Sequence, residues 1–257
     1  MNYQHLIEKF SSKQEAGFWI RNYVNTYGFL LIEDFQIAFL DVEKPKQLLD
    51  FSSYIGSPVA HNLGMKDFVW EIGLKPNSSL IKTFSEHSMT APLHTDSQYR
   101  DKPEKYMVLL AVKQAKCGGG ETHLVDFKQV LQDMKSSKEG KGVLKFISEN
   151  QFPIAVPSVF KKDCQESYIM SRLISDNPFI RYRYDILKTG ISLIKTNNSH
   201  EFHKNLELFN RFIQNSSHRL GFQLLKNSLL IVDNHRILHG RSCFWDSERL
   251  LLRVRLN

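Results

Sequence analysis

Two short segments, far apart in this chain, carry side chains that bind metal ions. The first is His94-Thr95-Asp96, and the second contains His239 within the run Asn234–Arg241. Two imidazoles and one carboxylate, with coordination positions left over, are a ligand set that suits ferrous iron. If these side chains hold one ion, the fold must bring together the two ends of a long intervening segment.

The spacing inside the first segment fits a β-strand. Side chains two positions apart on a strand point to the same side, so His94 and Asp96 would grip one ion while Thr95 points away. The third ligand, His239, would then come from another strand. A His-x-Asp motif alone is weak, because roughly half of chains with ten histidines contain one by chance. Its other interpretation is a solvated turn before Ser97–Tyr99, so further features have to decide.

A glycine-rich segment follows the first motif. Cys117–Thr122 contains three consecutive glycines, which permit positive φ angles and a close approach of the backbone to another element. Thr122 begins an expected strand over Thr122–Val125, and its hydroxyl can donate a hydrogen bond to a carboxylate. The alternative is a hairpin turn without chemistry.

In the C-terminal segment Arg249–Leu256, all the arginines fall on one set of alternate positions, and the other set holds only Leu and Val. This alternation predicts a half-buried strand. Arg249, Arg253 and Arg255 share one face with Leu251. Such a face is either a solvated surface or turns inward, where a guanidinium pairs with a carboxylate through two parallel hydrogen bonds.

The order of these motifs is His-x-Asp, Gly-Gly-x-Thr, His-Gly-Arg and Arg-x3-Arg. It resembles the Fe(II)/2-oxoglutarate-dependent oxygenases of the taurine dioxygenase and clavaminate synthase-like superfamily. The resemblance extends from Tyr27 to the C-terminus. It implies an enzyme that uses Fe(II), 2-oxoglutarate and dioxygen, and that releases succinate and carbon dioxide while it oxidises a substrate.

Residue by residue, the resemblance assigns the iron to His94, Asp96 and His239. Halogenating relatives carry a small residue in place of the carboxylate, so Asp96 implies hydroxylation or another oxidation. Gln98, just after the metal motif, is a further candidate for contact with substrate or cosubstrate.

The resemblance also implies a cosubstrate site. Thr122 would hydrogen-bond 2-oxoglutarate, and Arg249 would bind its distal carboxylate. Arg253 matches a position that contacts substrate in some relatives. Because the gap from His239 to Arg249 is short, it stays open whether Arg253 holds the cosubstrate instead. Arg241 either helps to anchor the cosubstrate or braces its loop.

A coarse secondary-structure prediction indicates which segments form the strands, helices and loops around these motifs. A capping-box pattern at Ser12–Glu15 predicts a helix to Tyr27, ended by Gly28. A loose loop is expected at Ser136–Gly142. Further strands are expected at 29–32, 69–74, 80–84, 106–112, 168–173, 179–184 and 228–232, and further helices at 43–54, 127–134, 143–149 and 201–219.

This pattern predicts a mainly β fold with flanking helices, built on a double-stranded β-helix (jelly roll) core. We expect residues 1–257 to form a single domain. A helical or loop insertion within about 128–227 would shape the substrate pocket. In the segment Phe179–Asp185, aromatic residues alternate with Arg181 and Arg183. We interpret it as a strand whose arginines are solvated.

Composition narrows the class of protein. The three cysteines, Cys117, Cys164 and Cys243, form no Cys-x-x-Cys pair, which favours a reduced, cytoplasmic protein over a disulfide framework. No apolar run approaches the roughly 20 residues of a membrane span. The net charge is +7, but the basic residues are scattered, so nucleic-acid binding is not favoured. The sequence does not indicate an oligomeric state.

The sequence therefore predicts an oxygenase that hydroxylates a small metabolite. Arg253 would serve an anionic group of that substrate, which favours an amino-acid-like compound. Arg253 would otherwise pair with a protein carboxylate such as Asp233 or Glu121, because an unpaired buried guanidinium is costly. Two alternatives remain: the same chemistry on a protein or nucleic acid, and a barrel that binds a ligand without catalysis.

Overall fold

The computed structural model describes residues 10–35, 43–60, 67–74, 83–158, 166–175, 179–194 and 198–257. No helix in these ranges is long and apolar enough to cross a membrane. The elements in chain order are α2 (Lys13–Tyr27), β1 (Phe29–Ile32), α3 (Lys44–Ser52), β2 (Pro58–Val59), β3 (Val69–Ile72), β4 (Ala91–His94), β5 (Tyr106–Lys113), β6 (Thr122–Asp126), α4 (Phe127–Ser136), α5 (Lys138–Glu149), β7 (Phe152–Ala155), β8 (Tyr168–Ser171), α6 (Tyr184–Leu193), α7 (Ser199–Gln214), β9 (Leu220–Phe222), β10 (Leu229–Asp233), β11 (Ile237–Arg241) and β12 (Leu250–Leu256).

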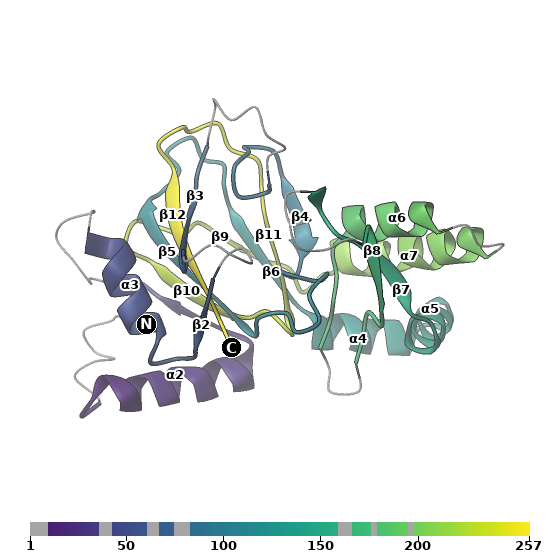
Figure 1. Cartoon of the computed structure of the whole chain (residues 1–257), viewed down its shortest axis with the longest axis horizontal. Helices are drawn as coiled ribbons and strands as arrows, with labels where there is room; N and C mark the ends of the chain where they lie inside the picture. The colour runs from purple at the N-terminus through teal and green to yellow at the C-terminus, as the bar shows by residue number, and fades with distance from the viewer. Residues whose placement is uncertain are drawn as a thin grey trace.

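Two antiparallel sheets form the centre of the molecule (Figure 1). The larger sheet has the order β1-β10-β5-β12-β2, with β3 also paired to β12, and the smaller sheet has the order β4-β11-β6-β9. Helices α2 and α3 pack on the outer face of the larger sheet, and α4 to α7 with the hairpin β7–β8 lie beside the smaller one. This arrangement confirms the predicted double-stranded β-helix with flanking helices.

Residue alternation along the central strands explains how each sheet contributes to two cores. In β5, Val108 and Leu110 pack toward α2 and α3, whereas Met107 and Leu109 pack between the two sheets. β12 follows the same period of two. Its Leu252, Val254 and Leu256 join the outer core, and Leu251 joins the core between the sheets. Arg253 and Arg255 therefore face the interior, which is one of the two orientations that the alternation left open.

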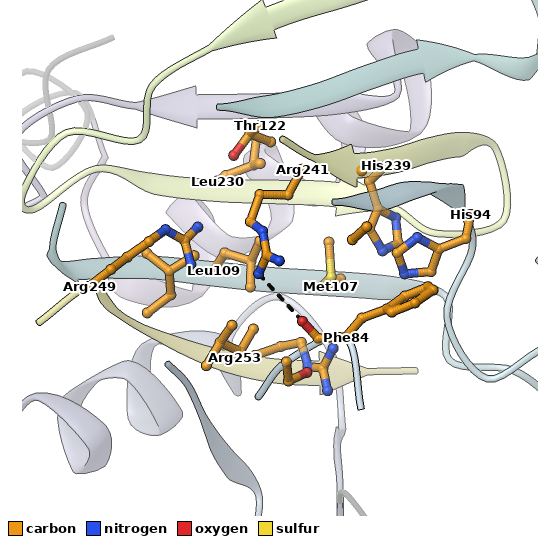
Figure 2. Close-up of a pocket in the computed structure, with 15 residues that line it drawn as sticks. Phe84, His94, Met107, Leu109, Thr122, Leu230, His239, Arg241, Arg249 and Arg253 are labelled. Atoms are coloured by element: carbon orange, nitrogen blue, oxygen red, sulfur yellow. Dashed lines mark hydrogen bonds between the residues drawn. The ribbon is translucent and has the colours of Figure 1, made fainter. Parts of the chain in front are cut away.

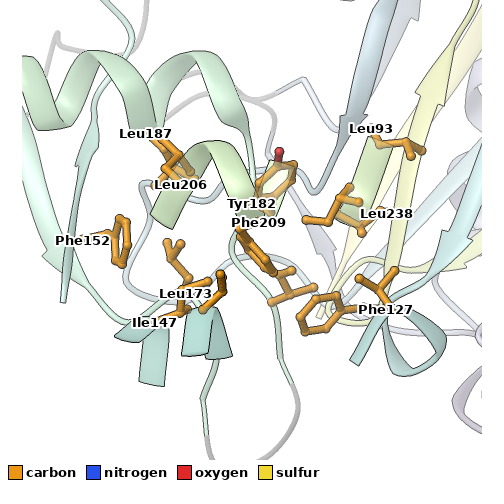
Figure 3. Packing of buried hydrophobic residues seen from close by; sticks show 14 of the residues in the cluster. Leu93, Phe127, Ile147, Phe152, Leu173, Tyr182, Leu187, Leu206, Phe209 and Leu238 are labelled. Atoms are coloured by element: carbon orange, nitrogen blue, oxygen red, sulfur yellow. The ribbon is translucent and has the colours of Figure 1, made fainter. Parts of the chain in front are cut away.

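The outer face of the smaller sheet is covered by an aromatic-rich core (Figure 3). Leu93 of β4 and Leu238 of β11 pack there against residues of the helices. Phe127 of α4 and Phe209 of α7 meet edge to face, with ring centroids 6.0 Å apart. Tyr182 contacts Phe209 in the same way, at 5.5 Å. These contacts anchor the two strands that carry the histidine motifs.

The first helix begins and ends as predicted. The Ser12 hydroxyl accepts from the backbone N–H of Glu15 at 3.1 Å, and Gly28 ends the helix with a φ of 90°. In a capping box, the Glu15 carboxylate would accept from the backbone N–H of Ser12. Here it accepts instead from the backbone N–H and the hydroxyl of Ser11, one residue earlier.

The loop predicted at Ser136–Gly142 is mostly helical, so that prediction is wrong. Helix α5 begins at Lys138, and the Ser137 hydroxyl caps it by accepting from the N–H of Gly140 at 3.0 Å. Gly140 allows close packing on the end of α4, because a Cβ there would lie 2.2 Å from the Met134 carbonyl oxygen. The two glycines in a polar segment suggested a loop. In the structure both lie in the helix, and Gly140 is needed for its close contact with Met134.

The strand predicted over Phe179–Tyr184 is also wrong. Only an isolated bridge joins Ile180 to Ile174, and Tyr184 begins helix α6. Ile180 and Tyr182 are buried as expected. Arg181 is buried too, with 9% of its surface exposed, because its guanidinium donates to the backbone carbonyls of residues 98, 100 and 101.

Other differences concern boundaries. The last long helix ends at Gln214 and not at residue 219, because Leu220–Phe222 forms the edge strand β9. The strand predicted at 80–84 falls mainly on residues outside the described ranges, and Phe84 lies in a turn. Cys117 and Cys243 are free thiols, and Cys164 lies outside the described residues. The single domain and its insertion within about 128–227 stay predictions.

Two glycine substitutions in α5 test its early start. Gly140→Ala should lower the free energy of unfolding by about 1–3 kcal/mol, because the new methyl group overpacks against Met134. Gly142→Ala, with nothing within 4 Å of its Cβ, should raise it by about 0.5–1 kcal/mol because alanine favours the helix. Denaturant unfolding measures both. Equal destabilisation by the two variants would place residues 138–142 outside a helix.

Candidate active site

The two sequence motifs meet where β4 pairs with β11. His94 and His239 are direct antiparallel partners, and their ring centroids lie 4.5 Å apart. The Nε2 atom of each imidazole lies 3.8 Å from Oδ1 of Asp96. One ligand atom from each of the three residues falls within 4.8 Å of the others, and all three residues are buried. The structure thus brings the predicted metal ligands together.

The orientation and protonation of His94 suit metal binding. Its Nδ1 is 2.8 Å from the backbone carbonyl of Pro92, which accepts a hydrogen bond from the ring and leaves the lone pair on Nε2. Burial, followed by the nearby His239, lowers the pKa of His94 to about 3. The imidazole is therefore neutral at neutral pH, which is the form that ligates a metal.

Asp96 reaches the cluster by a route that the sequence did not predict. Strand β4 ends at His94, so the expectation that both ligands share one strand is wrong. The backbone N–H of Thr95 donates to the Tyr182 carbonyl at 2.7 Å, and that of Asp96 donates to Oδ1 of Asn234 at 2.7 Å. The Asn234 side chain thereby takes the place of a strand neighbour and holds Asp96 beside the histidines.

Two arginines of β12 bind the other oxygen of the Asp96 carboxylate. Nη1 of Arg253 lies 3.1 Å from Oδ2, and Nη2 and Nε of Arg255 lie 3.1 and 3.2 Å from the same atom. Burial by itself raises the pKa of Asp96, but Arg255 and then Arg253 outweigh it and hold this pKa well below its usual value. The interpretation of this strand face as a solvated surface is therefore wrong, and Arg253 pairs with Asp96 rather than with Asp233 or Glu121.

A cavity of about 550 Å³, part of it open to solvent, lies between the sheets next to the histidines. Its walls are largely apolar, with Met107 and Leu109 from β5 and Leu230 from β10 (Figure 2). Among the described residues, its lining contains three arginines and no Asp or Glu. The imidazoles, guanidiniums and threonine that line it belong to His94, Thr122, His239, Arg241, Arg249 and Arg253.

Arg249 lies at the other end of this cavity from His94 (Figure 2). Only 4% of its surface is exposed, and its Nη1 has no hydrogen-bond partner among the described residues. Burial lowers its pKa to about 10, so the guanidinium stays charged at neutral pH. A buried cation of this kind calls for an anionic ligand. Thr122 lines the same cavity, as the predicted cosubstrate site requires.

The glycine-rich segment makes room for Arg249. Gly118 and Gly120 both have a φ of 76°. A Cβ at Gly120 would lie 3.0 Å from Nε of Arg249, and one at Gly119 would lie 2.3 Å from the Cys243 carbonyl oxygen. Both predicted uses of the glycines, positive φ and close approach, are therefore present.

The two remaining candidates make contacts within the protein. Arg241 donates to the backbone carbonyls of Phe84, His87 and Met89 and so braces that loop beside the cavity (Figure 2). Its role in anchoring cosubstrate stays a prediction. Gln98 is 2% exposed, donates to the Tyr182 carbonyl at 3.3 Å and does not line the described cavity.

Several residues at the site were missed by the sequence reasoning. The Phe84 ring lies 5.2 Å from that of His94, and the guanidinium of Arg183 sits over it at 4.0 Å. The guanidiniums of Arg241 and Arg249 lie over the Phe244 ring, with their Cζ atoms 4.5 and 4.9 Å from its centroid. Phe84 lies in a turn and Phe244 in a loop, and residue spacing gives no signal for such positions.

Several solved structures share this fold. Asparagine oxygenase in complex with Fe(II), 3-hydroxyasparagine and succinate has a TM-score of 0.69 at 16% identity, over 95% of this chain and 78% of that one. The non-heme iron oxygenase OrfP, with Fe and alpha-ketoglutaric acid, has a TM-score of 0.71 at 15% identity, over 94% and 78%. PvcB of Pseudomonas aeruginosa has a TM-score of 0.65 at 18% identity, over 94% and 80%.

The family is shown by a match over nearly the whole sequence. No curated protein matches the chain. Residues 7–255 match the family described as taurine catabolism dioxygenase TauD, TfdA family, and this range includes the whole His94, Asp96 and His239 cluster. The chain therefore belongs to the TauD/TfdA family and is an oxygenase that depends on Fe(II), 2-oxoglutarate and dioxygen.

Proposed function

We propose that this oxygenase hydroxylates a small anionic or amino-acid-like metabolite, with iron held by His94, Asp96 and His239 and with 2-oxoglutarate held by Thr122 and Arg249. The observation that carries the proposal is the buried Arg249 guanidinium. Its Nη1 has no hydrogen-bond partner among the described residues, at the far end of a cavity that is also lined by the imidazoles of His94 and His239.

The choice of Arg249 over Arg253 for the cosubstrate rests on their partners. The Arg253 guanidinium already donates to Asp96, whereas the Arg249 guanidinium is charged and its Nη1 has no hydrogen-bond partner among the described residues. A dicarboxylate that reaches the metal ligands with one end can place its other carboxylate on Arg249, where two parallel N–H donors bind it. The Thr122 hydroxyl is available for a further hydrogen bond.

The protein's own groups prepare the site for this chemistry. When bound, iron supplies the redox chemistry that activates dioxygen. The neutral His94 and the ionised Asp96 are both in the protonation state that a metal ion requires. Apolar walls, formed by residues such as Met107 and Leu230, limit the water around the reacting groups.

The charge of the site favours an anionic substrate. The described lining contains three arginines and no Asp or Glu, and Arg183, which is paired with Asp185 at 2.7 Å, lies over the Phe84 ring next to the cavity. Asparagine oxygenase was solved with hydroxyasparagine and OrfP with (3S)-hydroxy-L-Arg, so two proteins of this fold bind hydroxylated amino acids. Because their identity to this chain is low, an amino-acid-like substrate is here a proposal.

The size of the cavity is that of a small-molecule site. We therefore prefer a metabolite over a protein or nucleic-acid substrate. A cytoplasmic location stays a prediction.

Loss of a metal ligand should abolish iron binding. His239→Ala leaves His94 and Asp96 with an incomplete ligand set, so anaerobic calorimetry should detect no stoichiometric Fe(II) uptake and turnover should cease. His218→Ala, which removes an exposed pair with Asp133, is the matched control and should bind iron normally. A His239→Ala protein that still couples 2-oxoglutarate decay to product at the native rate would show that the third ligand is misassigned.

The cosubstrate site is tested by two substitutions. Arg249→Gln should raise the dissociation constant for 2-oxoglutarate by about 100-fold, because it removes two charge-assisted hydrogen bonds. Thr122→Val should weaken binding by about 1–2 kcal/mol. Arg211→Gln, which breaks an exposed ion pair with Glu139, should leave it unchanged. A large effect of Arg253→Gln with little effect of Arg249→Gln would exchange the roles of the two arginines.

A screen identifies the substrate class. Anionic and neutral small molecules, including amino acids, are tested for stimulated succinate formation by the Fe(II)-loaded enzyme. We expect the hits to carry a carboxylate or similar anion. For such a hit, Arg183→Gln should raise KM and leave the affinity for 2-oxoglutarate unchanged, because Arg183 lies over the Phe84 ring, which lines the cavity 5.2 Å from the His94 ring. Hits confined to neutral compounds would exclude the anionic substrate.

A further inference from the structure

The two oxygens of the Asp96 carboxylate have different surroundings. Oδ1 faces the Nε2 atoms of His94 and His239, each at 3.8 Å. Oδ2 lies within 3.2 Å of three nitrogens from two guanidiniums, one of Arg253 and two of Arg255. One oxygen thus faces the two predicted histidine ligands, and the other is bound by the two guanidiniums.

Both guanidiniums come from one strand of the opposite sheet. Residues 253 and 255 share the inward face of β12, and β12 is held on both sides, by β5 and by β3 or β2. Arg253 and Arg255 are antiparallel partners of Leu109 and Met107 in β5. This central position fixes the backbone from which the two arginines reach across to Asp96.

The arginines are also balanced electrostatically. Glu104 is 1% exposed and forms an ion pair with Arg100. Its charge and that of Asp96 both favour the charged forms of Arg253 and Arg255, against the cost of their burial. The charges of two carboxylates therefore favour the buried arginine pair, and both guanidiniums bind the Asp96 carboxylate directly.

We propose that Arg253 and Arg255 act as positioning residues that restrict Asp96 to a single metal-binding oxygen, Oδ1. The inference rests on the proposed iron site. In an octahedral site, three single-atom protein donors leave room for a chelating cosubstrate and dioxygen together. A second Asp96 oxygen on the metal would occupy one of these positions and compete with chelation by 2-oxoglutarate.

Arg255 is the residue to change, because Arg253 lines the cavity and Arg255 does not. Arg255→Met removes two of the three donors to Oδ2. In anaerobic protein loaded with Fe(II), 2-oxoglutarate is titrated by calorimetry and by the visible absorption of its iron chelate. We expect its dissociation constant to rise about 10- to 100-fold, which is about 1.4–2.8 kcal/mol, because a second Asp96 oxygen would take a position that the chelate needs. The affinity for Fe(II) itself should not fall, because a cation near the metal has been removed.

Two further variants separate positioning from a purely structural role. Arg255→Lys keeps the charge but loses the forked donors, and should weaken chelation by a smaller factor of about 3–10. Arg181→Gln removes a buried arginine that donates to backbone carbonyls, so it should lower the melting temperature without changing chelation. Melting temperatures of all variants are compared by circular dichroism.

The outcomes are distinct. Unchanged chelation in a folded Arg255→Met or Arg255→Lys protein would overturn the inference, and so would a loss of iron affinity with unchanged chelation. If Arg255→Met does not fold, Arg255→Lys decides. Absence of iron-dependent 2-oxoglutarate binding in the unmodified enzyme would instead contradict the proposed function.

Discussion

The antiparallel register of β4 with β11 is the constraint on which the site depends. It sets His94 directly opposite His239. Because side chains alternate between faces of a sheet, a slip of one residue would turn His239 outward and bring Leu238 into the cavity. Leu93 and Leu238 are anchored in the core under α4 to α7, so the helices on the outer face of the smaller sheet fix the register that the inner face needs. The helical segment between the motifs therefore serves the site without contributing a predicted metal ligand.

The space between the two sheets is cationic. The end near His94 and the end near Arg249 differ in how this positive charge is compensated. At the metal end, Asp96 binds Arg253 and Arg255 within the protein. At the other end, Arg241 and Arg249 share the Phe244 ring, and Arg241 is satisfied by backbone carbonyls. Arg249 alone of these four has a buried nitrogen without a partner and no ion pair among the described residues. A dianionic cosubstrate that bridges the two ends would complete both the metal site and the charge balance.

Features that depend on local sequence were predictable, and features that depend on distant partners were not. The alternation in β12, the Ser12 cap and the glycine-rich segment beside Arg249 follow from residue type and period. The departure of Asp96 from the strand depends on Asn234, which is 138 positions away. The burial of Arg181 depends on free carbonyls in a loop that no motif marks. The helical Gly140 depends on contact with Met134 in the preceding helix.

The most direct test of this account is a crystal structure of the protein grown without oxygen in the presence of Fe(II) and 2-oxoglutarate, with anomalous data collected at the iron absorption edge. The account predicts one iron bound by His94, His239 and a single oxygen of Asp96, with the distal carboxylate of 2-oxoglutarate on Arg249. An iron peak elsewhere, or 2-oxoglutarate bound with Arg249 left unpaired, would contradict it.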